Sequence, residues 1–306
     1  MKKRLVGALA AVFLSCFGSL SSATTFPLPS SKDAMLGNLQ YSTSSFGDTV
    51  VSIMQQYNLG VNAVEDANPQ VNFGYALRSG IHLTIPSAFL LPPLPRKGIV
   101  INLAEMRMYY YPGNGVVKTY PIGIGKVGKT IPLAMTRITH KTINPKWTPP
   151  QDIREYNQQQ GVELPEVMGA GPDNPLGPYA IYLGVPTYLI HSTIFPDSVG
   201  RRASFGCIRM NEHDIKEFFP EVKRNTPVAI VNMPVKAGWV GNKLYLEAHP
   251  ALDEHSDMVD NTLPGVVEIV QAATQGRKAI IDWQLVSRIE EIRDGVPHEI
   301  GISAAG

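Results

Sequence analysis

The spacing of hydrophobic residues changes several times along the chain, and each change marks a segment with its own expected structure. Within residues 38–87, alternating and helical stretches succeed one another. The expected strand, helix, helix and strand lie at 39–45, 50–57, 61–67 and 81–85. Alternating apolar residues are typical of a half-buried strand, and apolar residues three and four apart are typical of a helix. The pattern therefore predicts a small α+β unit of order βααβ.

Beyond residue 97 the hydrophobic period is two, which predicts a mostly β domain over residues 98–233. The expected strands lie at 98–103, 107–111, 116–122, 135–141, 179–183, 187–191 and 227–231. One helix begins after Asn211 and is expected to support the sheet through an apolar stripe. Residues 142–178 are rich in Pro, Gly and Asn, and a loop of this length in a compact domain predicts a functional lid.

Two further segments flank this domain. Residues 88–97 are rich in proline, so we expect an extended linker that separates domains and does not pack as an element. Residues 234–306 contain an expected strand at 243–247 and an expected helix capped by Asp282. They predict a small α/β C-terminal accessory domain in which no chemistry is evident.

The first 23 residues have the pattern of a signal peptide. Basic residues at 2–4 precede an almost uninterrupted apolar stretch at 5–20, and small residues follow at 21–23. This order predicts export to the periplasm. Two alternatives stay open, an uncleaved membrane anchor and a lipoprotein attached through Cys16. The balance of 27 Lys and Arg against 26 Asp and Glu argues against a protein that coats nucleic acid, so no nucleic-acid partner is expected.

Removal of the signal peptide leaves Cys207 as the one cysteine of the exported chain, so it cannot form an internal disulfide. A lone thiol in an oxidising compartment is either buried and inert or used for its reactivity. His191, sixteen residues upstream, is expected at the end of a strand. An imidazole can take a thiol proton and return it to a leaving amine, which is the equipment for acyl transfer.

The residues around Cys207 suit such a reaction. Gly206 lets the backbone approach a substrate carbonyl, and N–H groups around Gly206 and Cys207 are expected to stabilise an oxyanion. Arg201, Arg202 and Arg209 make the stretch positive, so we expect the pKa of the Cys207 thiol to be lowered and a substrate carboxylate to be attracted. For Arg201 and Arg202, a solvated loop surface is the alternative.

The pair His191-Ser192, followed at residues 204–210 by SFGCIRM, resembles the signature of the L,D-transpeptidases. The resemblance spans about residues 97–232 and includes the stretches WTPP and AGPDNPLG, which are similar to the periplasmic branch that attaches a lipoprotein to peptidoglycan. It implies a β-sandwich or barrel with one supporting helix, and Cys207 as the nucleophile.

The same resemblance implies roles for neighbouring residues. His191 would be the general acid and base, Ser192 would orient it through its backbone carbonyl, and Arg209 would help to form the donor pocket. The other residues expected to bind substrate are Ser204, Phe205 and Gly206.

The implied reaction needs no metal, nucleotide or other cofactor. Cys207 attacks the carbonyl of diaminopimelate in a tetrapeptide stem of peptidoglycan, and the terminal D-Ala leaves. The thioester is then resolved by an amine, either from a second diaminopimelate or from a lysine of a lipoprotein, whereas water as acceptor makes the protein an L,D-carboxypeptidase. Carbapenems are expected as covalent inhibitors.

Residues 38–87 resemble a LysM domain through the stretches GDT, ANP and GIHLTIP. The resemblance implies binding of the N-acetylglucosamine-containing glycan of peptidoglycan, with a structural appendage without glycan affinity as the alternative. Two other interpretations stay open, one of the whole chain and one of its histidines and Cys207. One is a non-catalytic wall-binding protein, and the other is a zinc site made of His140, His191, Cys207 and His213, whose spacing matches no recurrent ligand pattern.

Overall fold

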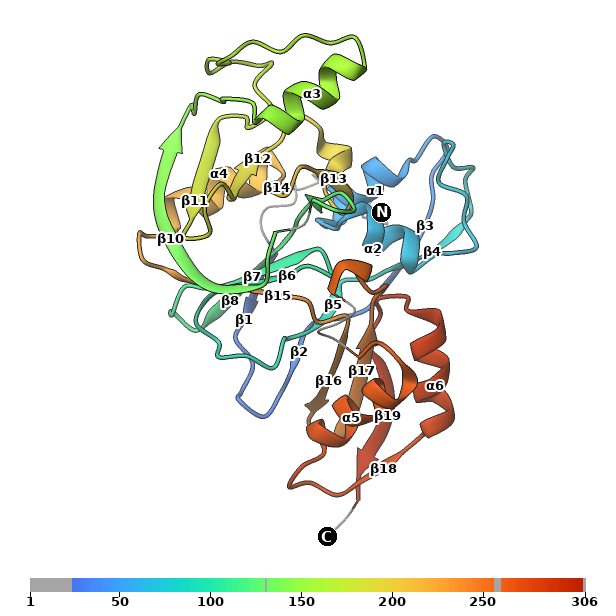
Figure 1. Cartoon of the computed structure of the whole chain (residues 1–306). Coiled ribbons are helices and arrows are strands. Elements are labelled where there is room, and N and C mark those ends of the chain that lie inside the picture. Colours follow the sequence, from blue (N-terminus) through green and yellow to red (C-terminus); the bar gives the residue numbers. More distant parts are fainter. Residues whose placement is uncertain (1–23, 130, 256–259, 305–306) are drawn as a thin grey trace, which may run out of the picture.

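The computed structural model describes residues 24–129, 131–255 and 260–304. The expected signal peptide and Cys16 lie outside the described residues. Figure 1 shows three parts: a central curved sheet with the lid above it, an N-terminal unit beside the sheet, and a C-terminal unit below.

The central part is a nine-stranded sheet, which agrees with the expected mostly β domain. In spatial order its strands are β1 (Thr24–Pro27), β8 (Val116–Pro121), β7 (Arg107–Tyr111), β6 (Gly98–Asn102), β15 (Pro227–Val231), β10 (Ala134–Ile143), β11 (Tyr179–Leu183), β12 (Leu189–Ser192) and β14 (Ile208–Met210). Neighbouring strands are antiparallel except for β6 with β15 and β12 with β14, which are parallel. A separate pair joins β9 (Ile124–Gly125) to β13 (Arg202–Ser204).

The long strand β10 curves the sheet around a core (Figure 1). Its register against β11 shifts between Ile138 and His140, and such an irregularity bends a strand. The helix α4 (Glu212–Glu221) closes the concave side and buries Phe218, whose ring lies 5.2 Å from that of Tyr110 and 5.3 Å from that of Tyr120. The expected supporting helix is therefore present, and it packs behind the strands that carry the site.

The lid, residues 142–178, contains a helix that the sequence pattern did not indicate. This helix, α3 (Gln151–Gln159), has no buried residue. Its flanks are joined by backbone hydrogen bonds between Trp147 and Met168, with N···O distances of 2.9 and 2.7 Å. The buried amide of Asn174 donates to the carbonyl oxygens of Pro145 and Gly169 and thereby holds the base of the lid.

The N-terminal unit has the expected order of elements. Its members are β3 (Gln40–Thr43), α1 (Val50–Tyr57), α2 (Val61–Asp66) and β4 (His82–Ile85), and β3 pairs with β4 in antiparallel fashion. Thr49 caps α1 in a capping box with Ser52. Asn68 is fully buried and bonds to Val64 and Thr84, so one side chain ties α2 to β4.

The prediction of an unpacked linker at residues 88–97 is wrong for its first half. Residues 88–91 are buried, and β5 (Ala88–Leu90) pairs with β2 (Met35–Gly37). The core of the N-terminal unit is also continuous with Val100, Tyr109 and Tyr111 on one face of the central sheet. The apolar run before the prolines forms β5, and its partner β2 lies some fifty residues upstream. The proline-rich composition of the segment therefore did not indicate that its first residues are packed.

The C-terminal unit is a four-stranded sheet with two helices and its own core. In spatial order its strands are β16 (Val235–Val240), β17 (Lys243–Ala248), β19 (His298–Ser303) and β18 (Ala279–Ile281), and its helices are α5 (Leu263–Ala273) and α6 (Trp283–Ile292). The Asp282 side chain caps α6 by accepting from the Leu285 N–H at 2.9 Å.

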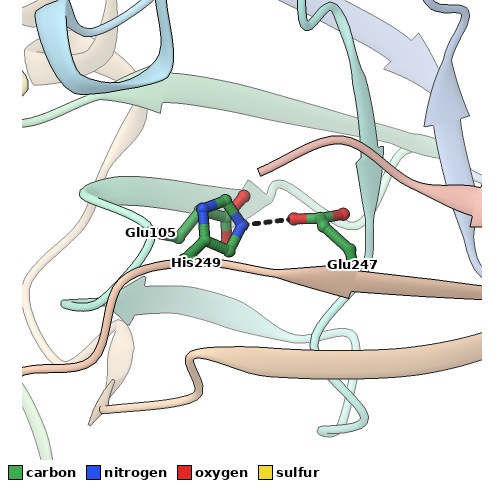
Figure 2. Close-up of side chains that lie close together, drawn as sticks. All are labelled: Glu105, Glu247 and His249. Carbon is green, nitrogen blue, oxygen red and sulfur yellow. Dashed lines mark hydrogen bonds and ion pairs between the residues drawn. The ribbon is translucent and has the colours of Figure 1, made fainter. Parts of the chain in front are cut away.

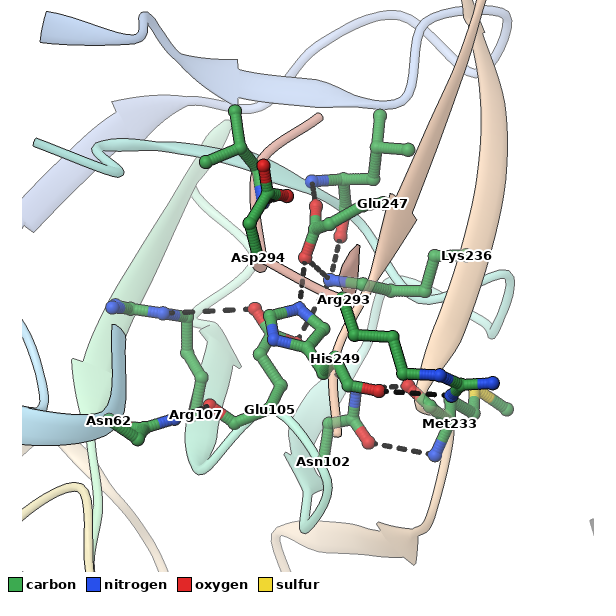
Figure 3. A network of polar contacts seen from close by, with 12 residues as sticks. Asn62, Asn102, Glu105, Arg107, Met233, Lys236, Glu247, His249, Arg293 and Asp294 are labelled. Carbon is green, nitrogen blue, oxygen red and sulfur yellow. Dashed lines mark hydrogen bonds and ion pairs between the residues drawn. The ribbon is translucent and has the colours of Figure 1, made fainter. Parts of the chain in front are cut away.

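A buried charge network connects the three parts (Figure 3). The ammonium of Lys236 is fully buried and donates to the Leu90 carbonyl at 2.7 Å and to Glu105 Oε2 at 2.9 Å, and it pairs with Glu247 Oε1 at 2.7 Å. His249 contacts the same Glu247 oxygen at 2.6 Å. Although burial raises the pKa of Glu247, Lys236 and His249 lower it to about 2. The network is thus a set of charges paired across the junction.

Candidate active site

Cys207 lies in the tight turn between β13 and β14. Gly206, before it, has φ +114, a conformation that L side chains rarely adopt. A Cβ at Gly206 would lie 2.7 Å from the ring of Tyr188 and 2.9 Å from the carbonyl oxygen of Lys129. The turn that presents the thiol therefore needs glycine for its backbone conformation and for the space around it.

Ser204 holds this turn together and does not face the site as expected. It is 2 % exposed, and its Oγ donates to the Cys207 carbonyl at 2.6 Å while accepting the Gly206 N–H at 3.0 Å. The expectation that the Gly206 N–H stabilises an oxyanion is therefore wrong for this conformation. Of the two N–H groups that we expected to stabilise an oxyanion, only that of Cys207 is still a candidate.

The pairing of β12 with β14 brings His191 beside the strand that Cys207 directly precedes. The strands are parallel, and His191 is the register partner of Arg209. Register partners in a parallel pair point to the same side, so Arg209 and His191 share one face. Cys207 directly precedes β14, and the charge of Arg209 acts on both His191 and the thiol. The register thus places His191 beside Arg209, and the joint role of these residues with Cys207 stays a prediction.

His191 is held in one tautomer. It is 4 % exposed, and its Nδ1–H donates to the Ser192 carbonyl oxygen at 2.5 Å. The carbonyl can only accept, so the proton of a neutral ring lies on Nδ1 and Nε2 is left as the acceptor. The Ser192 hydroxyl in turn donates to the Leu176 carbonyl at 2.9 Å, which anchors the strand end to the base of the lid.

Both candidate catalytic groups are neutral at rest. Burial, followed by the charge of Arg209, lowers the pKa of His191 to about 4, although interactions with the Ser192 and Leu176 carbonyls work in the opposite direction. Burial raises the pKa of the Cys207 thiol more than the Leu189 N–H and Arg209 lower it. The thiol donates to the Thr187 carbonyl oxygen at 3.9 Å. The expectation of a thiol pKa lowered by a positive loop is therefore wrong, because burial outweighs the charge.

Two of the three arginines near the thiol are paired with acids from distant segments. Arg201 bonds to Glu65 of the N-terminal unit at 3.1 Å, and Arg202 bonds to Glu254. Arg209 differs, since its Nε is buried and has no hydrogen-bond partner among the described residues. An orphaned guanidinium donor beside the thiol suits a substrate carboxylate.

Phe205 faces the lid. Its ring centroid lies 5.5 Å from that of Tyr156 on α3, and the Lys126 ammonium lies 3.8 Å from the Phe205 centroid and 4.0 Å from the Tyr156 centroid. Lys129 pairs with Asp152 at 2.5 Å at the start of the same helix. The lid is thus attached directly to the turn that carries Cys207. Sequence reasoning missed Lys126 and Lys129, because no local pattern marks a lysine that will lie between two rings.

The zinc hypothesis gains no support from the described part of the chain. Among the described residues, one group of His, Cys, Asp or Glu side chains has its ligand atoms close enough together to hold one metal ion. This group consists of Glu105, Glu247 and His249 (Figure 2). Lys236 already contacts both of its carboxylates. His140 stacks instead on the ring of Tyr182, with centroids 3.9 Å apart.

Comparison with known proteins identifies the family. The model of the YkuD L,D-transpeptidase catalytic domain matches residues 96–230. The chain is 39% identical to the probable L,D-transpeptidase YcfS of Escherichia coli K12 over 289 residues, which cover 92% of this chain and 89% of YcfS. The chain belongs to the L,D-transpeptidase family. The resemblance drawn from His191 and residues 204–210 is thereby confirmed. This L,D-transpeptidase is also 36% identical to the probable L,D-transpeptidase YbiS of the same strain, over 89% of this chain and 92% of YbiS.

The solved structures to which this chain is similar include the catalytic domain of an Enterococcus faecium L,D-transpeptidase acylated by ertapenem. It aligns with a TM-score of 0.34 and 21% identity, over 46% of this chain and 100% of that domain. Within the described residues of this L,D-transpeptidase, each helix is too short or too polar to cross a bilayer.

Proposed function

We propose that this L,D-transpeptidase acts on peptidoglycan stem peptides through a thioacyl enzyme at Cys207. The observation that carries the proposal is the register of β12 and β14, which pairs His191 with Arg209, two residues after Cys207. The fixed tautomer of His191 supports it, because Nε2 is then the proton acceptor. Each group has a defined task in acyl transfer.

The first half-reaction begins with a neutral thiol. Cys207 turns from Thr187 toward His191, Sγ attacks the carbonyl carbon of diaminopimelate, and Nε2 takes the thiol proton. The Cys207 N–H stabilises the oxyanion, and Arg209 binds a carboxylate of the stem. His191 then gives its proton to the amine of the departing D-Ala, which leaves a thioester and a neutral imidazole.

The second half-reaction runs in reverse with a new amine. His191 removes a proton from the attacking amine, and Cys207 leaves as the thiol. A diaminopimelate amine gives a 3-3 cross-link, a lysine of a lipoprotein gives an attached protein, and water gives a tripeptide. Muropeptide analysis of cells that lack or overproduce the protein distinguishes these acceptors, because each leaves a different product in the sacculus.

A non-catalytic wall-binding protein is the competing proposal, and a mass measurement decides between them. Incubation with a carbapenem should add one acyl group to the folded wild type and none to Cys207→Ala. The adduct should map to the peptide that contains Cys207. A folded wild type that stays unmodified would leave only the binding function.

The N-terminal unit is proposed to be a LysM domain that binds glycan. A hollow of about 560 Å³ lies on it, and the polar residues that line the hollow are Gln70, Asn72, Arg78 and His82. Phe46 and Tyr75 are 86 % and 78 % exposed. Their two loops are joined by backbone hydrogen bonds from Gly47 to the Leu77 carbonyl and from Leu77 to the Asp48 carbonyl. Exposed aromatic rings beside a polar hollow suit a sugar chain.

Glycan affinity is tested by sedimentation with purified sacculi. Tyr75→Ala should weaken binding, whereas Trp283→Ala, which removes an exposed ring from the C-terminal unit, should not. Equal binding by both variants and the wild type would favour a structural appendage.

Export to the periplasm is proposed from the pattern of residues 1–23. Sequencing of the N-terminus of the protein from a periplasmic fraction should show cleavage after residue 23. Metabolic labelling with palmitate would instead reveal a lipoprotein on Cys16, and an intact N-terminus in the membrane fraction would reveal an anchor.

A further inference from the structure

The loop that joins His191 to Cys207 rests on the N-terminal unit. The first two N–H groups of α2 donate to this loop, from Val61 to the Val199 carbonyl and from Asn62 to the Gly200 carbonyl, both at 3.1 Å. These N–H groups have no partner within their own helix, so the loop satisfies them. Val199 is fully buried in the core that the N-terminal unit shares with the sheet.

Two glycines make this contact possible. A Cβ at Gly200 would lie 2.2 Å from the Val61 nitrogen, and a Cβ at Gly60 would lie 2.9 Å from Gly200 Cα. Gly200 also has φ +78, whereas Gly60 has φ −82, which any residue adopts. The backbones at Gly60 and Gly200 are therefore so close that a side chain at either position would clash with the other.

The same loop is bonded on its other side to the backbone that carries Arg209. The Gly200 N–H donates to the Ile122 carbonyl at 3.0 Å, and Gly123 exchanges two 2.9 Å hydrogen bonds with Arg209. A Cβ at Gly123 would lie 2.3 Å from the Ser198 carbonyl oxygen and 3.4 Å from Arg209 Cβ. The loop is therefore in close backbone contact with Gly123, and Gly123 is bonded to Arg209.

We propose that the contact between Gly60 and Gly200 positions Arg209 beside Cys207, which makes the N-terminal unit a part of the active-site scaffold. Gly60 and Gly200 are positioning residues that act through Arg209. The inference rests on the proposed roles of Cys207 and Arg209, and it gives the N-terminal unit a task that is independent of glycan binding.

Alkylation of Cys207 by two reagents tests the proposal. Iodoacetate carries a carboxylate and iodoacetamide does not, so the ratio of their rates, corrected for the same ratio with glutathione, reports the charge of Arg209 at the thiol. Unit charges about 7 Å apart in water change this ratio roughly threefold. Arg209→Gln gives the lower limit of the ratio. Mass spectrometry of the Cys207 peptide makes the readout specific.

Gly60→Ala is the principal variant, because alanine is compatible with its φ and the added Cβ meets the Gly200 backbone. The other close atom, Asn62 Oδ1 at 2.6 Å, belongs to a side chain. We expect its ratio to fall toward that of Arg209→Gln, and Gly200→Ala should show a larger fall. Gly115→Ala is the matched control, since Gly115 has φ +79 and no atom within 4 Å of an added Cβ. Its ratio should equal that of the wild type.

A wild-type ratio in folded Gly60→Ala and Gly200→Ala would overturn the proposal, and so would an equal fall in Gly115→Ala. Unfolded protein would also lose the preference for iodoacetate, so the ratio is measured only on variants whose circular dichroism matches that of the folded wild type. If the wild type is not acylated by a carbapenem, the proposed function fails, but the alkylation ratio still decides whether the N-terminal unit positions Arg209.

Discussion

The pH dependence of Cys207 is the sharpest test of the neutral resting state. A histidine of ordinary pKa, 6.5, is about 90% protonated at pH 5.5, so only about a tenth of it can act as a base. With its pKa lowered to about 4, His191 is about 97% neutral at that pH. The two cases differ roughly tenfold in competent enzyme at pH 5.5, which is well outside the error of a rate measurement.

Stopped-flow acylation by a carbapenem measures the base, and alkylation by iodoacetamide measures the thiolate. We expect the acylation rate to be flat from pH 5 to pH 8 and to fall as the pH passes below about 4. Alkylation should climb steadily through neutral pH, because burial raises the pKa of the thiol. A plateau of alkylation below pH 7, together with an acylation inflection above pH 6, would refute the reasoning, since both indicate a preformed thiolate and imidazolium pair.

The variant Arg209→Gln separates the two causes of the His191 shift. Burial is the larger cause and Arg209 the next, so the inflection should move to higher pH while staying below 6.5. The same pKa affects stability. A depressed histidine pKa stabilises the fold above pH 6.5, and this stability is lost as the pH falls toward 4, by about 3 kcal/mol at most. The slope of unfolding free energy over this window should be reduced in His191→Gln.

Three other perturbations have defined outcomes. Lys236→Met removes the ammonium that two buried carboxylates share, which should cost about 3–5 kcal/mol of stability and lower the Tm in calorimetry by roughly 10 °C. Lys243→Met removes one partner of an exposed ion pair and should change the Tm little. Equal shifts of the Tm in the two variants would contradict the argument. Gly206→Ala should stay folded by circular dichroism but slow carbapenem acylation by about 100-fold, because the added Cβ meets the Lys129 carbonyl; an unchanged rate would show that the turn tolerates a side chain. Burial raises the pKa of Asp214 to about 7, so the stability linked to its protonated form is lost as the pH rises through 7. Asp214→Asn should therefore stabilise the protein against urea more at pH 8 than at pH 4, and a gain that is the same at both would be inconsistent with this shift.

The sequence predicted those parts of the fold whose signal is local. Alternation marked β6, β7 and β8, and the stretch at residues 204–210 marked the turn that carries Cys207. The helix α3 escaped because it has no buried face, so there is no hydrophobic period to detect. Its contact with the site depends on Tyr156 and Lys126, whose meeting is a matter of tertiary structure.

Electrostatics at the site was mispredicted for a similar reason. Counting arginines near Cys207 gave a positive loop, but Glu65 and Glu254, from segments far away in the chain, pair with two of them. The burial that dominates the pKa of the thiol is created by the whole sheet and is invisible in the neighbouring residues. The family signature at residues 204–210 could therefore be recognised in the sequence, whereas pKa shifts that depend on tertiary surroundings could not be predicted from it.

The packing of residues 88–91 changes what a glycan-binding unit can contribute. A unit on a flexible tether raises the local concentration of wall at the active site whatever the orientation of the strand. Here the Leu90 N–H donates to Glu247, the Leu90 carbonyl accepts from Lys236, and α2 is bonded to the loop at Val199. The N-terminal unit is therefore held against the rest of the protein and does not move on a tether. A docked unit increases the occupancy of Cys207 only for glycan strands whose stems point from the unit to the thiol, and it gives nothing for other orientations. The glycan binding that we propose for this L,D-transpeptidase would thus select among donor strands by their direction.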